Sequence, residues 1–304
     1  MMMKDILLNY LVHICGAENV AENVPLSQKT TFRIGGNARY FVTVPTANAL
    51  FRLLSALNFL EQKYFIIGLG ANILADSSGY NGVIIKLGFN KITHNDEFIY
   101  ADAGAKLGVV ANYARENGLS GLEWCVGIPA TIGGACFMNC GAFGKSMEDV
   151  VAMVDVIYDG EIKTLTNKEI AYSYRHSIFQ DRPMIIIGAY LKMTKGDPEQ
   201  IGAAMKEILI KRSNHPKEPS AGSVFLRPYD GFYVGKEIEK LGLKGHTVGG
   251  AKVSDEHANF IINNGGATSD DVLNLIDEIK TKVKSATGVE LRHEIKLLNN
   301  DNYL

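Results

Sequence analysis

The chain has 304 residues, 46% hydrophobic and 21% charged, which is typical of a globular protein with more than one compact unit. Its net charge of -2 excludes the broad basic field that nucleic-acid binding usually needs, so we expect no nucleic-acid partner. No segment is long and apolar enough to span a bilayer, and polar residues interrupt the N-terminal apolar stretch. We therefore expect a cytoplasmic protein without membrane insertion.

The four cysteines do not suggest a disulfide framework in a chain of this length. Cys136 and Cys140 are close in sequence, but neither a second cysteine pair nor a histidine cluster stands at zinc spacing. We expect small buried hydrophobic side chains in a reducing compartment, and no metal site.

Helices and strands alternate through the first two thirds of the chain. Helical periodicity covers residues 4–15, 47–62 and 107–117, and strand patterns cover 40–44, 64–67, 82–87, 98–101, 150–158, 161–165 and 184–193. Asp159-Gly160 predicts a tight hairpin turn between two of these strands. The mixture predicts an α+β or α/β fold.

The last third begins with a helical pattern over 198–212, so we predict one domain over residues 1–196 and a second over 197–304. A Gly-punctuated region over 220–266 precedes a helix whose N-terminus is capped and charged by Ser269-Asp270-Asp271. We expect residues 289–298 to form a final strand.

Two glycine-rich loops are candidates for binding a phosphate-bearing cofactor. The first follows a strand and carries Gly68 and Gly70, but Ile73 occupies the third glycine position of a Rossmann fingerprint, so that interpretation fails. The second, residues 121–144, carries six glycines among apolar residues and almost no charge. Each loop alone could be structural, but two in one half of the chain favour a large cofactor over a packed corner.

Three polar segments are candidates for catalysis. Arg175 lies among aromatic and apolar residues, where it is either an ion-pair partner or an anion clamp. Ser223 follows a glycine turn, but it lacks the second glycine of a nucleophile elbow and an evident base, which argues against a serine hydrolase. Glu290 and Glu294 would share one face of the final strand, where a solvated edge is the alternative interpretation.

These segments together resemble one family. The runs TFRIGGN (31–37), GLGANIL (68–74), GIPATIGGACFMNCGAFG (127–144), YSYRHSIF (172–179), PSAGSVFLRP (219–228) and GVELRHEIK (288–296) are similar, in order and spacing, to the UDP-N-acetylenolpyruvoylglucosamine reductases (MurB), in their second, shorter type.

The resemblance implies an α+β fold. A vanillyl-alcohol-oxidase-type (PCMH-type) FAD-binding half would have two α+β subdomains divided near residue 90, followed by a C-terminal α+β substrate-binding domain. It also implies bound FAD and NADPH as co-substrate. The cofactor contacts that it implies are Gly68, Leu69, Gly70, Ala71 and Asn72 for the pyrophosphate, and Ile128, Pro129, Thr131, Gly133, Gly134 and Asn139 for the flavin.

The resemblance further implies that Arg175, Ser223 and Glu294 are catalytic, with Glu294 chosen over Glu290 because the family's acid directly precedes a branched residue. The implied substrate contacts are Tyr174, Arg227, His257 and Asn259. His257 and Asn259 would lie two apart on a strand, although His257 could equally be a structural residue.

The implied reaction reduces the enolpyruvyl group of a UDP-sugar, with Ser223 protonating C2. It belongs to peptidoglycan and cell-wall synthesis, and so to cell shape, division and the cell cycle. Two alternatives remain open: a flavin oxidoreductase of the same fold with another substrate, and a nucleotide-binding module that has lost its flavin. The sequence leaves the oligomeric state undetermined.

Overall fold

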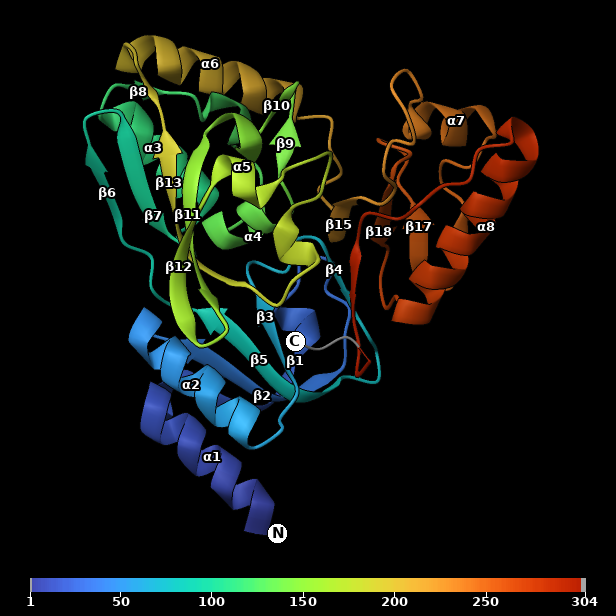
Figure 1. The fold of residues 1–304 in the computed structure, drawn as a ribbon. Helices are drawn as coiled ribbons and strands as arrows, with labels where there is room; N and C mark the ends of the chain where they lie inside the picture. Colours follow the sequence, from blue (N-terminus) through green and yellow to red (C-terminus); the bar gives the residue numbers. More distant parts are fainter. Residues whose placement is uncertain (1, 302–304) are drawn as a thin grey trace.

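The computed structural model describes residues 2–301 and contains three larger sheets, each packed with its own helices (Figure 1). The expected α+β fold is confirmed. The three units follow one another along the chain, and the C-terminal segment then returns to the first unit (Figure 1).

The first unit is a four-stranded sheet in the order β1-β2-β5-β3, with the last three strands parallel. Its elements are α1 (Met2–Cys15), β1 (Val20–Pro25), β2 (Asn37–Val44), α2 (Ala47–Phe59), β3 (Tyr64–Ile67) and β5 (Tyr80–Leu87). Leu11 on α1 and Leu50 and Leu53 on α2 are fully buried against the sheet, because their helical spacing places them on one face of each helix.

The second unit is a five-stranded antiparallel sheet in the order β12-β11-β13-β7-β6. Its main elements are β6 (Ile92–Asn95), β7 (Phe98–Asp102), α3 (Leu107–Glu116), α4 (Ile132–Phe137), β11 (Val151–Tyr158), β12 (Glu161–Thr166), α5 (Asn167–Ile170) and β13 (Ile185–Lys192). The hairpin predicted at Asp159-Gly160 joins β11 and β12, and both turn residues have positive φ.

The third unit packs two helices on a four-stranded antiparallel sheet in the order β15-β18-β17-β16. Its elements are β15 (Ser220–Ser223), α7 (Val234–Lys240), β16 (Thr247–Val248), β17 (Ala251–Val253), β18 (Phe260–Asn263) and α8 (Ser269–Thr287). Thr268 caps α8 in a capping box with Asp271, one residue before the predicted cap.

Two predictions about the last third are wrong. Residues 289–298 do not form one strand. Only Lys296–Leu298 forms a strand, β19, which pairs in parallel with β4 (Ile73–Ala75) of the first unit, whereas His293 makes an isolated bridge with Phe225. His257 and Asn259 lie in the turn between β17 and β18, since the strand resumes only at Phe260. The remaining short strands are β8 (Leu119–Ser120), β9 (Gly141–Ala142), β10 (Lys145–Ser146) and β14 (Thr194–Lys195).

The domain boundary predicted after residue 196 remains a proposal, and side-chain packing argues for a later position. Helix α6 (Pro198–Lys211) buries Ile201 and Met205 in the core of the second unit. We therefore propose that the boundary lies in the loop over 213–219, while a subdomain division near residue 90 fits the gap between β5 and β6. Across residues 2–301, no helix has the length and apolarity needed to cross a membrane.

Candidate active site

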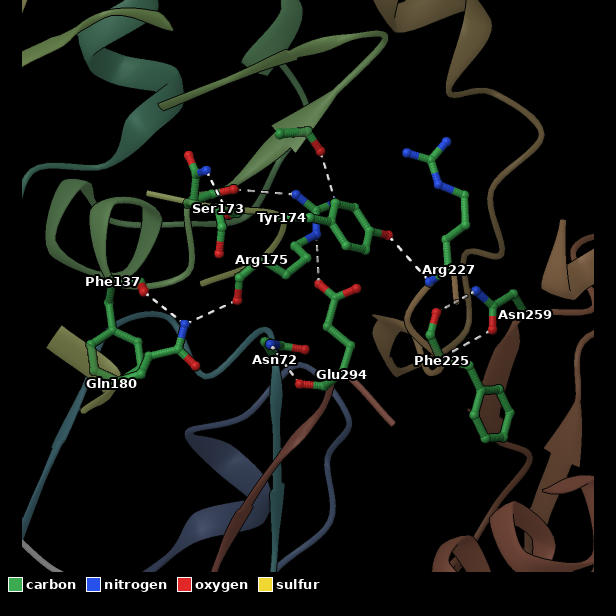
Figure 2. A network of polar contacts seen from close by, with 12 residues as sticks. Asn72, Phe137, Ser173, Tyr174, Arg175, Gln180, Phe225, Arg227, Asn259 and Glu294 are labelled. Carbon is green, nitrogen blue, oxygen red and sulfur yellow. Dashed lines mark hydrogen bonds and ion pairs between the residues drawn. The ribbon is translucent and has the colours of Figure 1, made fainter. Parts of the chain in front are cut away.

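Arg175 and Glu294 form a partly buried ion pair where the three units meet (Figure 2). Arg175 Nε lies 2.9 Å from Glu294 Oε1, and the two side chains are only 22% and 13% exposed. Burial raises the pKa of the Glu294 carboxyl above its ordinary value, and the nearby charge of Arg175 offsets this only in part. The pair thus joins a fixed cation to a carboxyl that holds its proton more tightly than an exposed one.

A tight turn places Arg175. Ser173 and His176 exchange two backbone hydrogen bonds of 3.1 Å, and Arg175 adopts φ 57° inside this turn. Its Nη2 donates to the Gly141 carbonyl at 2.8 Å, which directs the guanidinium toward the second glycine loop. A left-handed arginine is strained, and such strain persists where the surrounding contacts fix the conformation.

Gln180 supports the same turn, although no sequence pattern singles it out. Its Nε2 donates to the carbonyls of Arg175 at 3.0 Å and Phe137 at 3.1 Å (Figure 2). Its Oε1 accepts from Lys296 Nζ at 2.7 Å. Gln180 therefore ties the arginine turn both to the end of α4 and to β19, which follows Glu294.

Ser223 is the last residue of β15, on the third unit. The Glu294 N–H donates to the carbonyl of the adjacent Val224 at 2.7 Å, so backbone pairing brings the segments of Ser223 and Glu294 together. Within the described part of the chain, the Ser223 hydroxyl makes no hydrogen bond, which leaves it available to a ligand.

The predicted substrate residues Asn259 and His257 form hydrogen bonds with backbone groups of the protein. Asn259 Oδ1 accepts from the Phe225 N–H and its Nδ2 donates to the Phe225 carbonyl, both at 3.1 Å, so this amide fixes the strand that follows Ser223 (Figure 2). His257 Nδ1 accepts from the Asn259 N–H at 3.2 Å, and its ring packs on Phe260. These contacts favour the structural interpretation for His257.

Tyr174 and Arg227, also predicted to contact substrate, meet across two units. The Arg227 N–H donates to the Tyr174 hydroxyl at 3.4 Å, and the guanidinium carbons of Arg175 and Arg227 lie 5.7 and 5.4 Å from the Tyr174 ring centre. Tyr174 is 52% exposed, and Arg227 pairs with Asp230 at 3.0 Å. Both side chains are therefore accessible at the rim of the site.

The two glycine loops lie against each other. A methyl group on Gly68 would lie 2.8 Å from Thr131 Oγ1, and Thr131 is itself buried as the N-cap of α4. Gly133 donates its N–H to the Ala103 carbonyl at 2.9 Å, and a methyl group there would lie 3.0 Å from Ala103 Cβ. Glycine at these two positions thus permits close contact with the Thr131 side chain and with Ala103.

The first loop has features that suit a diphosphate. Within residues 2–301, the N–H groups of Leu69, Gly70 and Ala71 find no protein acceptor. A cleft of about 270 Å³ adjoins them and is lined by Gln28, Lys29, Thr30, Thr31, Gly68 and Lys86, among others. Free backbone donors and two lysines are the groups that hold the pyrophosphate of a dinucleotide.

Two predicted cofactor residues have other contacts. Asn72 joins the first loop to the catalytic segment, because its Nδ2 donates to the Glu294 carbonyl at 3.4 Å and its carbonyl accepts from Lys296 at 2.9 Å. Asn139 is 3% exposed, and its amide bonds to Glu148 and the Ser173 carbonyl, so it supports the arginine turn. Ile128 is half-buried, whereas Pro129 and Gly134 are exposed on the second loop.

Comparisons with known proteins agree with this arrangement. A family model described as "UDP-N-acetylenolpyruvoylglucosamine reductase, C-terminal domain" matches residues 214–298, and one described as "FAD binding domain" matches residues 38–166. A curated UDP-N-acetylenolpyruvoylglucosamine reductase of Caldanaerobacter subterraneus is 42% identical over 97% of this chain and 99% of its own length. One of Pseudothermotoga lettingae is 46% identical over 90% and 95%.

A solved structure has the same fold. The crystal structure of UDP-N-acetylenolpyruvylglucosamine reductase (MurB) from Thermus caldophilus superimposes with a TM-score of 0.79 at 34% identity, covering 90% of this chain and 97% of that chain. Both halves of the present chain therefore have counterparts in one protein, in the same order.

Proposed function

Because the chain belongs to the UDP-N-acetylenolpyruvoylglucosamine reductase family, we propose that it reduces the enolpyruvyl group of UDP-N-acetylglucosamine enolpyruvate to give UDP-N-acetylmuramate. The single observation that carries the proposal is the Arg175–Glu294 pair, joined by backbone pairing to the Ser223 segment and placed beside the glycine loops of an FAD-binding domain. NADPH is the proposed source of reducing equivalents.

The loops on this chain fit FAD. The free N–H groups of the first loop, together with Lys29 and Lys86 in the adjoining cleft, would hold the pyrophosphate. The second loop, with Thr131, Gly133 and Gly134, would flank the flavin ring. The chemistry supplied by bound FAD is hydride transfer from NADPH to C3 of the enolpyruvyl ether.

The protein's own residues handle the charge and the proton. Hydride addition at C3 leaves negative charge on C2 and the attached carboxylate of the substrate, and the fixed guanidinium of Arg175 is suited to stabilise it. The Ser223 hydroxyl then donates its proton to C2. Glu294 would hold Arg175 in its orientation. Because burial raises the pKa of its carboxyl, Glu294 would also place a protonatable group in the same site.

Tyr174 and Arg227, at the rim, are proposed to contact the sugar nucleotide. Asn259 and His257 would instead fix the backbone beside the site through their hydrogen bonds to it. We infer that the reaction takes place in the cytoplasm as a step of peptidoglycan precursor synthesis, and contributes through the cell wall to cell shape, division and the cell cycle. The match of residues 214–298 to the reductase C-terminal domain disfavours an oxidoreductase with another substrate.

The test is NADPH oxidation by the purified protein without oxygen, with and without UDP-N-acetylglucosamine enolpyruvate. We expect consumption to depend on the sugar nucleotide. A yellow protein that does not turn over this substrate would overturn the assignment but would still agree with an FAD-binding domain. A colourless protein that binds the sugar nucleotide would favour the flavin-less alternative.

A further inference from the structure

Arg212 lies at the end of α6, beside the second glycine loop and outside the Arg175–Glu294 pair. It is the C-cap of the helix, and its side-chain stem rests on the loop: a methyl group on Gly127 would be 3.1 Å from Arg212 Cδ. Its guanidinium carbon lies 5.2 Å from the ring centre of Phe143, in the same loop. Loop backbone and an aromatic ring therefore fix the position of this cation.

In the described part of the chain, two of the three guanidinium nitrogens of Arg212 are buried without a hydrogen-bond partner, in a side chain that is half-buried as a whole. Arg212 Nε and Nη2 are both shielded from solvent, and within residues 2–301 neither has a hydrogen-bond acceptor. A buried cation whose donors are unmatched is costly, and native proteins retain such a group mainly where a ligand supplies the partner. This arrangement calls for an acceptor on a ligand.

Among residues 2–301, no carboxylate forms an ion pair with Arg212, and the titratable groups that act on its pKa are Cys125, Cys140 and Arg175. Burial raises the pKa of Cys125 to about 12, and it also raises the pKa of Cys140, so both neighbouring thiols stay neutral near pH 7. Burial lowers the pKa of Arg212 itself, and the like charge of Arg175 acts in the same direction. The region between the two guanidinium groups is therefore suited to an anion.

The position of Arg212 indicates which anionic ligand group its guanidinium would bind. Glu294, the acidic group of the catalytic pair, contacts Arg175, whereas Arg212 contacts Gly127 and Phe143 of the proposed flavin loop. On the basis of the proposed FAD-dependent function, we propose that Arg212 is the cationic partner of the flavin ring and binds the negative charge that the ring gains on reduction. A cation beside the ring nitrogens favours the reduced state over the oxidised one.

The test compares the flavin of the FAD-loaded protein in three variants. Arg212→Met removes the charge and keeps the stem on Gly127, Arg212→Lys keeps the charge, and Lys211→Met removes an adjacent exposed charge 6.0 Å from the Phe143 ring. The measurement is the two-electron midpoint potential of bound FAD, by equilibration with a reference dye without oxygen and with excess FAD.

We expect Arg212→Met to weaken binding of reduced FAD at least tenfold more than binding of oxidised FAD, which lowers the potential by about 30 mV or more. Arg212→Lys should retain most of the wild-type potential, and Lys211→Met should retain it fully. If the methionine variant does not fold, Arg212→Gln, which keeps a neutral donor, should show the same drop.

An unchanged potential in a folded, FAD-loaded neutral variant overturns the proposal. Weaker binding of the sugar nucleotide at unchanged potential also overturns it, because Arg212 would then bind an anionic group of the substrate. The midpoint potential of bound FAD is measured without the sugar nucleotide. A wild-type protein that does not turn over this substrate would therefore refute the proposed function, but the comparison of potentials would stay valid.

Discussion

Ser223 differs from its polar neighbours because their side chains form hydrogen bonds or ion pairs within the protein and its hydroxyl does not. Asn259 and Glu294 hold the strand and the arginine around it, while the Ser223 hydroxyl has no partner among the described residues. Such a hydroxyl is free to orient toward a substrate carbon. In the proposed reaction this hydroxyl, a weak acid, would act beside negative charge that Arg175 stabilises.

Replacing Ser223 by alanine should separate the two half-reactions. Reduction of the flavin by NADPH should stay within about twofold of wild type, whereas reoxidation by the sugar nucleotide should slow by about 10²- to 10⁴-fold, the usual contribution of a general acid. Anaerobic stopped-flow absorbance of the flavin measures both steps. Equal losses in the two steps would show that Ser223 supports the fold instead of donating the proton.

The sequence singles out Arg175, Ser223 and Glu294 through the resemblance of their segments to one family, and their catalytic roles are proposals. It could not identify Gln180, whose importance depends on carbonyls of Phe137 and Arg175 that come together only in the folded chain. It also predicts that Asn259 contacts the substrate, which stays a prediction, but it does not reveal the two hydrogen bonds between this amide and the backbone of Phe225.

At the scale of elements, the glycine loops differ from ordinary turns in how closely they approach other backbone. Gly70 has φ 65°, and a methyl group there would collide with the Lys29 carbonyl and lie 2.8 Å from Thr30 Cα. Gly160, in the β11–β12 hairpin, has φ 73° with open space around it. The two glycines share a backbone conformation but not an environment.

This pair gives a matched test of the first loop. Gly160→Ala should cost about 1–2 kcal/mol of folding free energy, the strain of a left-handed alanine, and Gly70→Ala should cost more because it adds the collision with backbone. Only Gly70→Ala should also weaken FAD binding, by at least about tenfold, because the collision must displace the loop. Denaturant unfolding and quenching of FAD fluorescence on binding measure the two effects. Equal FAD affinities would mean that the loop does not contact the cofactor.

Elements with strong periodicity were predicted well, and those defined by tertiary pairing were not. The five long helices and four of the five strands of the second sheet follow from apolar spacing, whereas β6 was not predicted. The stretch 289–298 alternates like a strand, yet only Lys296–Leu298 forms one, because the stretch divides its backbone pairing between residues 224–226 and β4. Alternation indicates which face is buried, whereas a ladder also needs a neighbouring strand.

Across the whole molecule, short contacts between the units assemble the site. Thr31 Oγ1 donates to the Ser220 carbonyl at 2.7 Å, and Phe32 and Ile34 pack in the core of the third unit. The β4–β19 pairing adds a second connection on the other side of the site. The motif TFRIGGN therefore joins the first unit to the strand that ends in Ser223, a role that its sequence does not reveal.

The loop over 213–219 connects the second and third units, and His215 anchors it. The His215 ring lies 5.9 Å from that of His257 and 5.4 Å from that of Phe260. Burial lowers the pKa of both histidines, and the charge of Arg212 and the presence of His257 lower that of His215 further. The folded protein thus favours two neutral imidazoles packed on an aromatic ring.

This arrangement predicts a loss of stability in mild acid. The unfolded chain takes up protons near the ordinary histidine pKa of 6.5, but the folded chain does so only at lower pH, so the free energy of unfolding should fall as the pH drops below 6.5. His215→Phe, which keeps an aromatic ring against Phe260, should reduce this fall, while His94→Gln on the exposed part of β6 should not. Urea unfolding of the three proteins between about pH 5 and 7.5 measures how steeply the free energy of unfolding changes with pH. The same slope in His215→Phe and wild type would show that His215 does not contribute. The native state would then bind this proton as readily as the unfolded chain.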